Sequence, residues 1–146
     1  MHTLAHTGLL ALALAAAMPA AADHRKTLGG IEINIGVVPA AALLRVDAQE
    51  RSIHAAAPTT ATHHVVVGVS DARTGERIAD ARVTLDVEDP RGGLQSAQLD
   101  AAALRGYPDY SGLFRFGWSG PYRLHVRVVR PDAAPVSATF NWIQEY

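Results

Sequence analysis

The chain contains no cysteine, and its two methionines, Met1 and Met18, both lie near the N-terminus. Without cysteine no disulfide can form, so the stability of the fold must come from its core. A lipid anchor on a cysteine is excluded as well. Cu(I) prefers sulfur ligands, and the chain after Met18 has none. The residues after Met18 therefore offer only ligands that bind Cu(I) poorly.

An excess of charge of one sign is also missing. The chain carries 13 basic and 14 acidic residues, all after position 22, for a net charge of −1. Twelve of the bases are arginine, and they are interspersed with carboxylates. This distribution is typical of a solvated surface, and it gives no electrostatic field that favours nucleic acid or a membrane surface.

The single long apolar run is Leu9–Ala17, which is too short to span a bilayer. It precedes small residues at Ala20 and Ala22, which fit the subsites of a signal peptidase. We therefore expect residues 1–22 to be a signal peptide and the mature chain to begin near Asp23. The protein is then periplasmic or secreted, with no membrane insertion after cleavage.

The remaining residues, 23–146, are enough for one domain with a real core and too few for two ordinary domains. Period-2 alternation of apolar and polar residues dominates this part and predicts half-buried strands. The segment 47–62 has no clear period, so we expect a long loop with a turn of helix at 47–53. The expected strands cover 31–37, 63–70, 81–87, 94–99, 112–116, 122–129 and 136–142.

The short strands, regularly spaced turns and absence of a long helical pattern predict an all-β fold, an antiparallel immunoglobulin-like β-sandwich of about seven strands. A closed barrel is the alternative. We expect 112–116 and 122–129 to form a hairpin around Ser119-Gly120-Pro121, and 101–105 to add a helical turn. Alternation places Val67 and Leu124 inward and Thr84 and Arg123 outward.

Three stretches of the sequence have a familiar pattern. They are HHVVVGVSDARTGERIADARVTLDV (63–87), SGLFRFGWSGPYRLHVRVVRP (111–131) and VSATFNW (136–142). Together they resemble small exported immunoglobulin-like proteins of the YtkA-like and FixH-like kind, in which a "TG..I..A.V" hairpin and a late "G.Y.L.V.V" strand recur. The resemblance implies the same fold and a link to periplasmic copper or iron handling. The metal-carrying relatives commonly use methionine, which this chain lacks after residue 18.

Histidine is the residue type best suited to hold a divalent metal here, because imidazole binds Zn(II), Cu(II) and iron. Successive residues of a strand point to opposite faces, so His63 is expected inward and His64 outward, and the two do not share an ion. His125 is also expected outward, between Arg123 and Arg127. If the strands of His64 and His125 are neighbours in one sheet, the two imidazoles meet. The alternative is that these histidines are polar edge residues.

His24 is a metal candidate for a separate reason. Cleavage after Ala22 makes it the second residue of the mature chain, where the terminal amine, a backbone amide and the imidazole jointly suit Cu(II). A flexible terminus without a metal is the alternative. Metal candidates are therefore His64, His24 and His125, and a divalent ion held by histidine is the one cofactor that the sequence suggests.

No catalytic motif is present: G-x-S-x-G, H-E-x-x-H and a P-loop are all missing, so we expect no enzyme. Tyr107, Tyr110 and Trp118 are expected on turns, where they either anchor a partner or cap the sandwich. The sequence thus predicts an exported, non-enzymatic binding or accessory protein with a role in periplasmic copper, zinc or iron handling. The alternative is a protein-interaction or assembly module of the cell envelope that binds an envelope protein and no metal, with the oligomeric state open.

Overall fold

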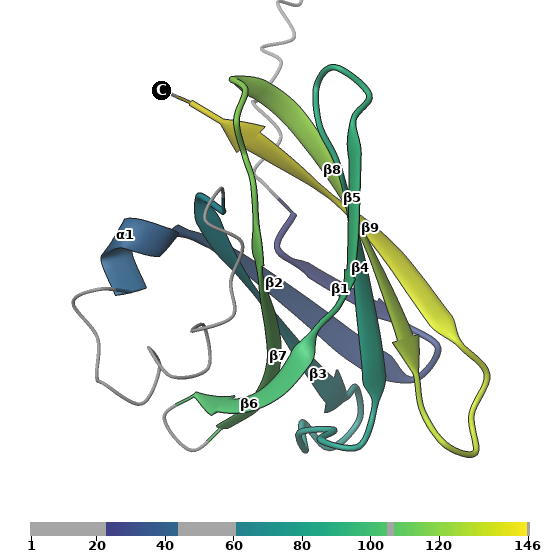
Figure 1. Ribbon diagram of the computed structural model, residues 1–146. Coiled ribbons are helices and arrows are strands. Elements are labelled where there is room, and N and C mark those ends of the chain that lie inside the picture. The colour runs from purple at the N-terminus through teal and green to yellow at the C-terminus, as the bar shows by residue number, and fades with distance from the viewer. Residues whose placement is uncertain (1–22, 44–60, 105–106, 146) are drawn as a thin grey trace, which may run out of the picture.

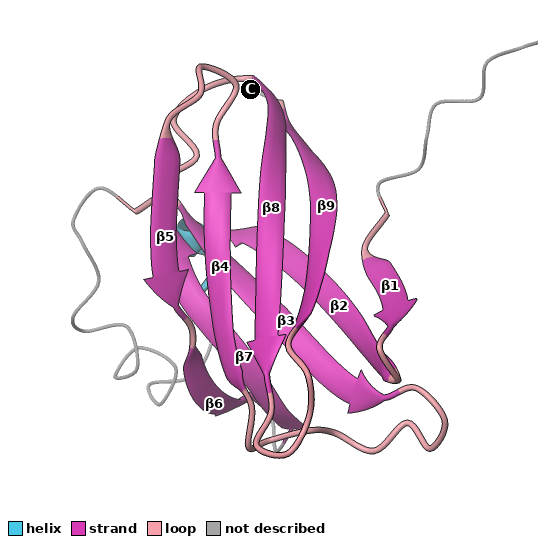
Figure 2. Ribbon diagram, turned by 90° about the vertical axis from the view of Figure 1, so that its right-hand side faces the viewer, coloured by secondary structure: helices cyan, strands magenta, loops and turns pink. Residues whose placement is uncertain are grey.

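The computed structural model describes residues 23–43, 61–104 and 107–145, and it contains two antiparallel sheets packed face to face (Figures 1 and 2). The first sheet has five strands in the order β1-β2-β3-β7-β6, and the second has four in the order β5-β4-β8-β9. The strands are β1 Arg25–Leu28, β2 Ile31–Pro39, β3 His63–Asp71, β4 Arg82–Glu88, β5 Leu94–Gln98, β6 Asp100–Leu104, β7 Tyr107–Phe114, β8 Gly120–Val129 and β9 Val136–Gln144. The expected antiparallel β-sandwich is confirmed.

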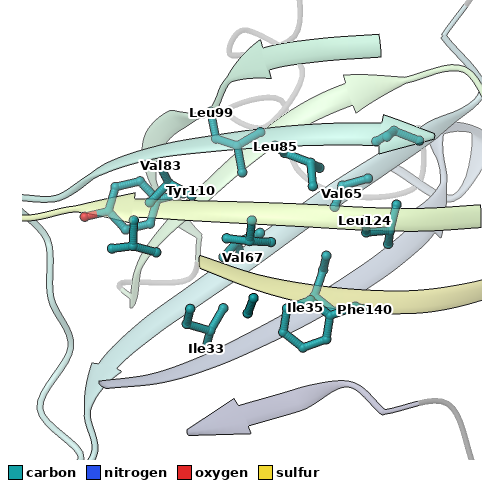
Figure 3. Packing of buried hydrophobic residues seen from close by; sticks show 14 of the residues in the cluster. Ile33, Ile35, Val65, Val67, Val83, Leu85, Leu99, Tyr110, Leu124 and Phe140 are labelled. Atoms are coloured by element: carbon teal, nitrogen blue, oxygen red, sulfur yellow. The ribbon is translucent and has the colours of Figure 1, made fainter. Parts of the chain in front are cut away.

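The core lies between the sheets and follows the alternation of the sequence. Each strand that contributes to it turns every second side chain into the core, as β3 does with Val67 and β8 with Leu124, which are 0% and 1% exposed. Figure 3 shows these side chains meeting in the space between the two layers. Thr84 and Arg123 have the opposite parity and face solvent, as predicted. β3 also buries residues of the opposite parity, among them His64 and Ser70.

Turn chemistry follows the sequence as well. Asp71 accepts hydrogen bonds from the backbone N–H groups of Arg73 and Thr74 through Oδ1, at 2.9 and 2.8 Å. Gly75 then takes a φ of 75°, a left-handed conformation that favours glycine. These donated hydrogen bonds hold the pKa of Asp71 below its ordinary value. The turn positions the chain to pass from β3 in the first sheet to β4 in the second.

The expected hairpin between 112–116 and 122–129 is wrong. β7 pairs with β3 and β6 in the first sheet, whereas β8 pairs with β4 and β9 in the second. The segment between β7 and β8 crosses from one sheet to the other, and Phe116 within it is buried against Tyr122, with ring centroids 4.6 Å apart. Alternation did not reveal this crossing. Two strands that bury one face in the same core show the same alternation whether they are neighbours in one sheet or lie in opposite sheets.

The helical turn expected at 101–105 is also wrong where the structure describes it. Residues Asp100–Leu104 form β6, which pairs with β7 from Tyr107 to Ser111. The short alanine run fits a helix or a strand, and pairing with the longer β7 selects the strand.

Two short elements were not expected. β1 pairs with β2 at the start of the described chain, and the four-residue helix α1, Ala40–Leu43, follows β2. The signal peptide at 1–22 and the helical turn at 47–53 lie outside the described residues, as does most of the loop at 47–62. Within the described part of the chain, no helix has the length and apolar character needed to cross a membrane.

Candidate functional site

His64 lies in β3 with the outward parity predicted for it, but it is not a surface residue. Only 1% of its surface is exposed, although its neighbours on the same face, Val66 and Leu113, are partly accessible. Parity thus placed the side chain on the correct face of the sheet and said nothing of what covers that face. A metal ion arriving from solvent has no direct access to this imidazole.

His63 points into the sandwich, as predicted. Its ring packs against Phe116 with centroids 4.9 Å apart, and its Nδ1 lies 2.8 Å from the hydroxyl of Thr62. Burial lowers the pKa of His63, because desolvation penalises the charged imidazolium. The neutral ring therefore acts as a part of the core at this end of the sandwich.

His125 lies on the outer face of the second sheet, on β8. Its Nδ1 lies 2.8 Å from the Thr139 hydroxyl on β9, and its Nε2 lies 3.8 Å from Glu88 Oε2 on β4. The residue beside it on β4 is Asp86, which in turn accepts a hydrogen bond from Ser96 on β5. Ser96, Asp86, His125 and Thr139 thus form one row across all four strands.

His64 and His125 do not meet. β3 and β8 belong to different sheets, and an outward side chain on one sheet faces away from an outward side chain on the other. The condition under which these two residues would share an ion is therefore not fulfilled.

The sequence places His125 between Arg123 and Arg127, and the structure adds the carboxylates of Glu88 and Asp86 on the neighbouring strand β4. Arg123 forms a bidentate pair with Glu88, with Nε–Oε2 and Nη2–Oε1 distances of 3.0 and 2.6 Å. These hydrogen bonds lower the pKa of Glu88 and raise that of Arg123. Because Glu88 is held by Arg123, it is poorly placed to serve as a metal ligand beside His125.

Sequence reasoning missed the partners of His125. Thr139 lies on the expected strand 136–142, and Glu88 directly follows the expected strand 81–87. Both have outward parity, so the alternation indicated the faces on which they lie. The alternation did not indicate the order of the strands or their register. It is this order and register that bring the two residues beside His125.

His24 is exposed and lies just before β1. Its backbone carbonyl accepts a hydrogen bond from Ile35 N at 2.9 Å, which fixes the main chain. Its ring lies beside Trp142 of β9, with centroids 6.2 Å apart and planes inclined by 58°. Of the three metal candidates, His24 is the one in the exposed class, since His64 is buried and His125 is partly exposed.

No group of three or more histidine, aspartate or glutamate side chains among the described residues is arranged to hold a metal ion. A site made from side chains alone does not fit this part of the chain. A site that also uses a terminal amine and a backbone amide at His24 requires no such cluster.

The aromatic residues expected on turns have different positions. Tyr107 and Tyr110 belong to β7, and Tyr110 is buried with 1% exposure. Trp118 does lie in the crossing between the sheets, 40% exposed, with the Arg91 guanidinium 3.4 Å from its ring centroid. The backbone N–H and C=O of Trp118 are both bonded to the Tyr122 hydroxyl at 3.0 Å.

A comparison with known proteins finds similar solved structures, whereas no family model and no curated protein sequence matches the chain. Copper-reconstituted P19 from Campylobacter jejuni is 13% identical, with a TM-score of 0.64 over 82% of this chain and 91% of that one. FetP of uropathogenic Escherichia coli strain F11, expressed in the periplasm, is 15% identical, with a TM-score of 0.62 over 84% and 94%. A DUF4426 family protein from Pseudomonas aeruginosa PAO1 is 14% identical, with a TM-score of 0.63 over 82% and 94%.

At these identities the likeness shows the fold. The chain is a two-sheet β-sandwich of the kind found in P19 and FetP, and these neighbours bind copper, since a single-residue variant of each is a copper-bound structure. The sequence implied a distant likeness to proteins linked to copper, and the similarity in fold to these copper-bound structures supports a distant likeness to copper-binding proteins. The comparisons do not extend it to the YtkA-like and FixH-like families.

Proposed function

We propose that this protein is an exported, non-catalytic accessory protein that binds Cu(II) at the mature N-terminus through His24. The copper-binding proteins among its structural neighbours support a role in metal handling. The observation that carries the choice of residue is the exposed His24 ring beside Trp142, because His64 is buried and His125 faces an arginine-bound carboxylate.

The proposal depends on cleavage after Ala22. That cleavage gives Asp23 a free amine one residue before His24, so the amine, the intervening amide nitrogen and the imidazole can bind one Cu(II) ion together. Asp23 Oδ2 lies 3.5 Å from Lys26 Nζ, and this ion pair ties the first residue to β1. The intact mass of the protein recovered from the periplasm should show the loss of residues 1–22, and a retained leader would contradict the site.

Trp142 provides the readout for binding, since Cu(II) quenches a nearby indole. The chain has two tryptophans, so Trp118→Phe leaves Trp142 as the only indole emitter. Titration of this variant with Cu(II) should give saturable quenching at one equivalent, and binding should weaken on acidification because the amine and imidazole must be deprotonated to bind.

The matched pair of variants is His24→Ala and His125→Ala, each made in the Trp118→Phe background. Replacement of His24 should abolish the saturable quenching while the fold is kept, and replacement of His125 should leave it unchanged. If calorimetry at pH 7.5 detects no saturable binding of Cu(II) or Zn(II), the metal role is rejected. The alternative, an envelope interaction module that binds no metal, would then be favoured.

A further inference from the structure

β9 forms an unusual edge of the second sheet. It has nine residues and pairs only with β8 among the described strands, so the backbone groups on its other side have no strand partner there. The other edge strands, β1, β5 and β6, have four or five residues. β9 is therefore the longest free edge in the described part of the molecule (Figure 2).

The sequence of β9 has none of the features that usually protect an edge. Val136–Gln144 (VSATFNWIQ) contains no charged residue, no proline and no glycine. Long edges in natural proteins are normally interrupted by lysine, proline or a bulge, which prevent another strand from pairing. By contrast, β1 carries Arg25 and Lys26 and β6 begins with Asp100.

β1 approaches β9 but does not close this edge. Lys26 Nζ lies 5.6 Å from the Phe140 ring centroid, and the His24 ring lies beside Trp142. These contacts are made to inward-facing side chains of β9. The backbone hydrogen bonds of β1 are made to β2, with none to β9.

We infer that β9 pairs antiparallel with β9 of a second copy of this chain, which joins the two second sheets into one sheet of eight strands about a two-fold axis. A two-fold axis relates a strand to its own copy in the antiparallel sense, so one strand supplies both halves of the interface. This inference is independent of the proposed copper site.

The side chains of β9 are complementary to their own copy. On the inner face Val136, Ala138 and Phe140 are apolar and already buried in the core of the single chain, so they place no charge beside the junction with the copy. On the outer face Ser137 and Asn141 are exposed, small and uncharged, so no like charges oppose one another across the axis. Ile143, 66% exposed at the end of the strand, gains cover. A single strand pair is a small interface, so the dimer should be reversible.

The test is sedimentation velocity of the purified exported protein over a wide range of concentrations, with a chelator present so that metal bridging is excluded. We expect a monomer–dimer equilibrium. The variant Ser137→Lys/Asn141→Lys places four lysines around the axis and should raise the dissociation constant by about tenfold or more. Ser96→Lys/Gln98→Lys adds the same charge to the outer face of the opposite edge, β5, and should leave the constant unchanged.

Hydrogen exchange of the unmodified protein keeps the test independent of how the variants fold. Amides of β9 should exchange more slowly at high concentration than at low concentration, whereas those of β5 should not change. A protein that is monomeric at every concentration, or a dimer equally stable in the β9 variant, would overturn the inference.

Discussion

Tyr110 and Ala81 are joined across the two sheets of the sandwich: the buried hydroxyl of Tyr110 on β7 accepts a hydrogen bond from the backbone N–H of Ala81 at 3.0 Å. The same hydroxyl donates to the carbonyl of Ile78 at 2.8 Å. One side chain of the first sheet thus fixes the chain that leads into β4 of the second. Burial raises the pKa of Tyr110, so the hydroxyl stays protonated and able to donate.

Tyr110→Phe removes both hydrogen bonds and keeps the ring packing. Because the N–H of Ala81 and the carbonyl of Ile78 lose a partner, we expect the free energy of unfolding to fall by about 1–3 kcal/mol. Chemical denaturation measures this loss. Amide exchange gives a local check, since the Ala81 amide should lose protection while Leu99, whose amide bonds Val83 O at 2.8 Å, should not. Unchanged exchange at Ala81 would refute the role given to the hydroxyl.

Truncation of inward side chains tests the register of the strands. Val67→Ala and Leu124→Ala each remove buried methyl groups and should lower the free energy of unfolding by about 2–4 kcal/mol. Thr84→Ala, on the outward face of β4, should change it by less than about 0.5 kcal/mol. Denaturant titration of the three variants measures these changes in the free energy of unfolding. Equal losses of stability at all three positions would contradict the sheet faces described above.

Gly68 lies under the side chain of Arg77, and a Cβ there would collide with the guanidinium. Arg77 Nη1 lies 3.3 Å from Asp109 Oδ1, so Gly68→Ala should displace this partly exposed ion pair and cost about 0.5–1 kcal/mol in thermal or chemical unfolding. Gly36→Ala is the control, because a Cβ on this glycine of the neighbouring strand meets no atom within 4 Å. Equal tolerance of both changes would mean that Arg77 does not occupy this position in solution.

His63 makes stability depend on pH. Its pKa is lowered from 6.5 in the folded protein, so the unfolded chain binds a proton more readily than the folded one. The contribution of neutral His63 is present above pH 6.5 and is lost as the pH falls through the lower, folded-state pKa. Unfolding measured from pH 7.5 downward should show this loss. His63→Leu should have a smaller pH dependence, whereas Thr84→Ala should keep that of the unmodified protein; an unchanged slope in His63→Leu would be evidence against this role.

Much of the fold followed from local chemistry in the sequence. Alternation in β3, β4, β8 and β9 identified both the strands and their buried faces, because a strand in a sandwich must bury every second residue. The turn at Asp71 and Gly75 followed from side-chain hydrogen bonding and from the freedom of glycine at positive φ. These features depend on neighbours in the chain, so the sequence by itself determined them.

Only the tertiary structure decided which strands are neighbours. Parity gives the face of a sheet to which a side chain points, but the partner strand and register depend on how the whole chain packs. The separation of His64 from His125, the pairing of Glu88 with Arg123 and the contact of His24 with Trp142 all come from that packing. The two residues of each pair are far apart in the sequence, so no local sequence pattern indicates whether they are in contact.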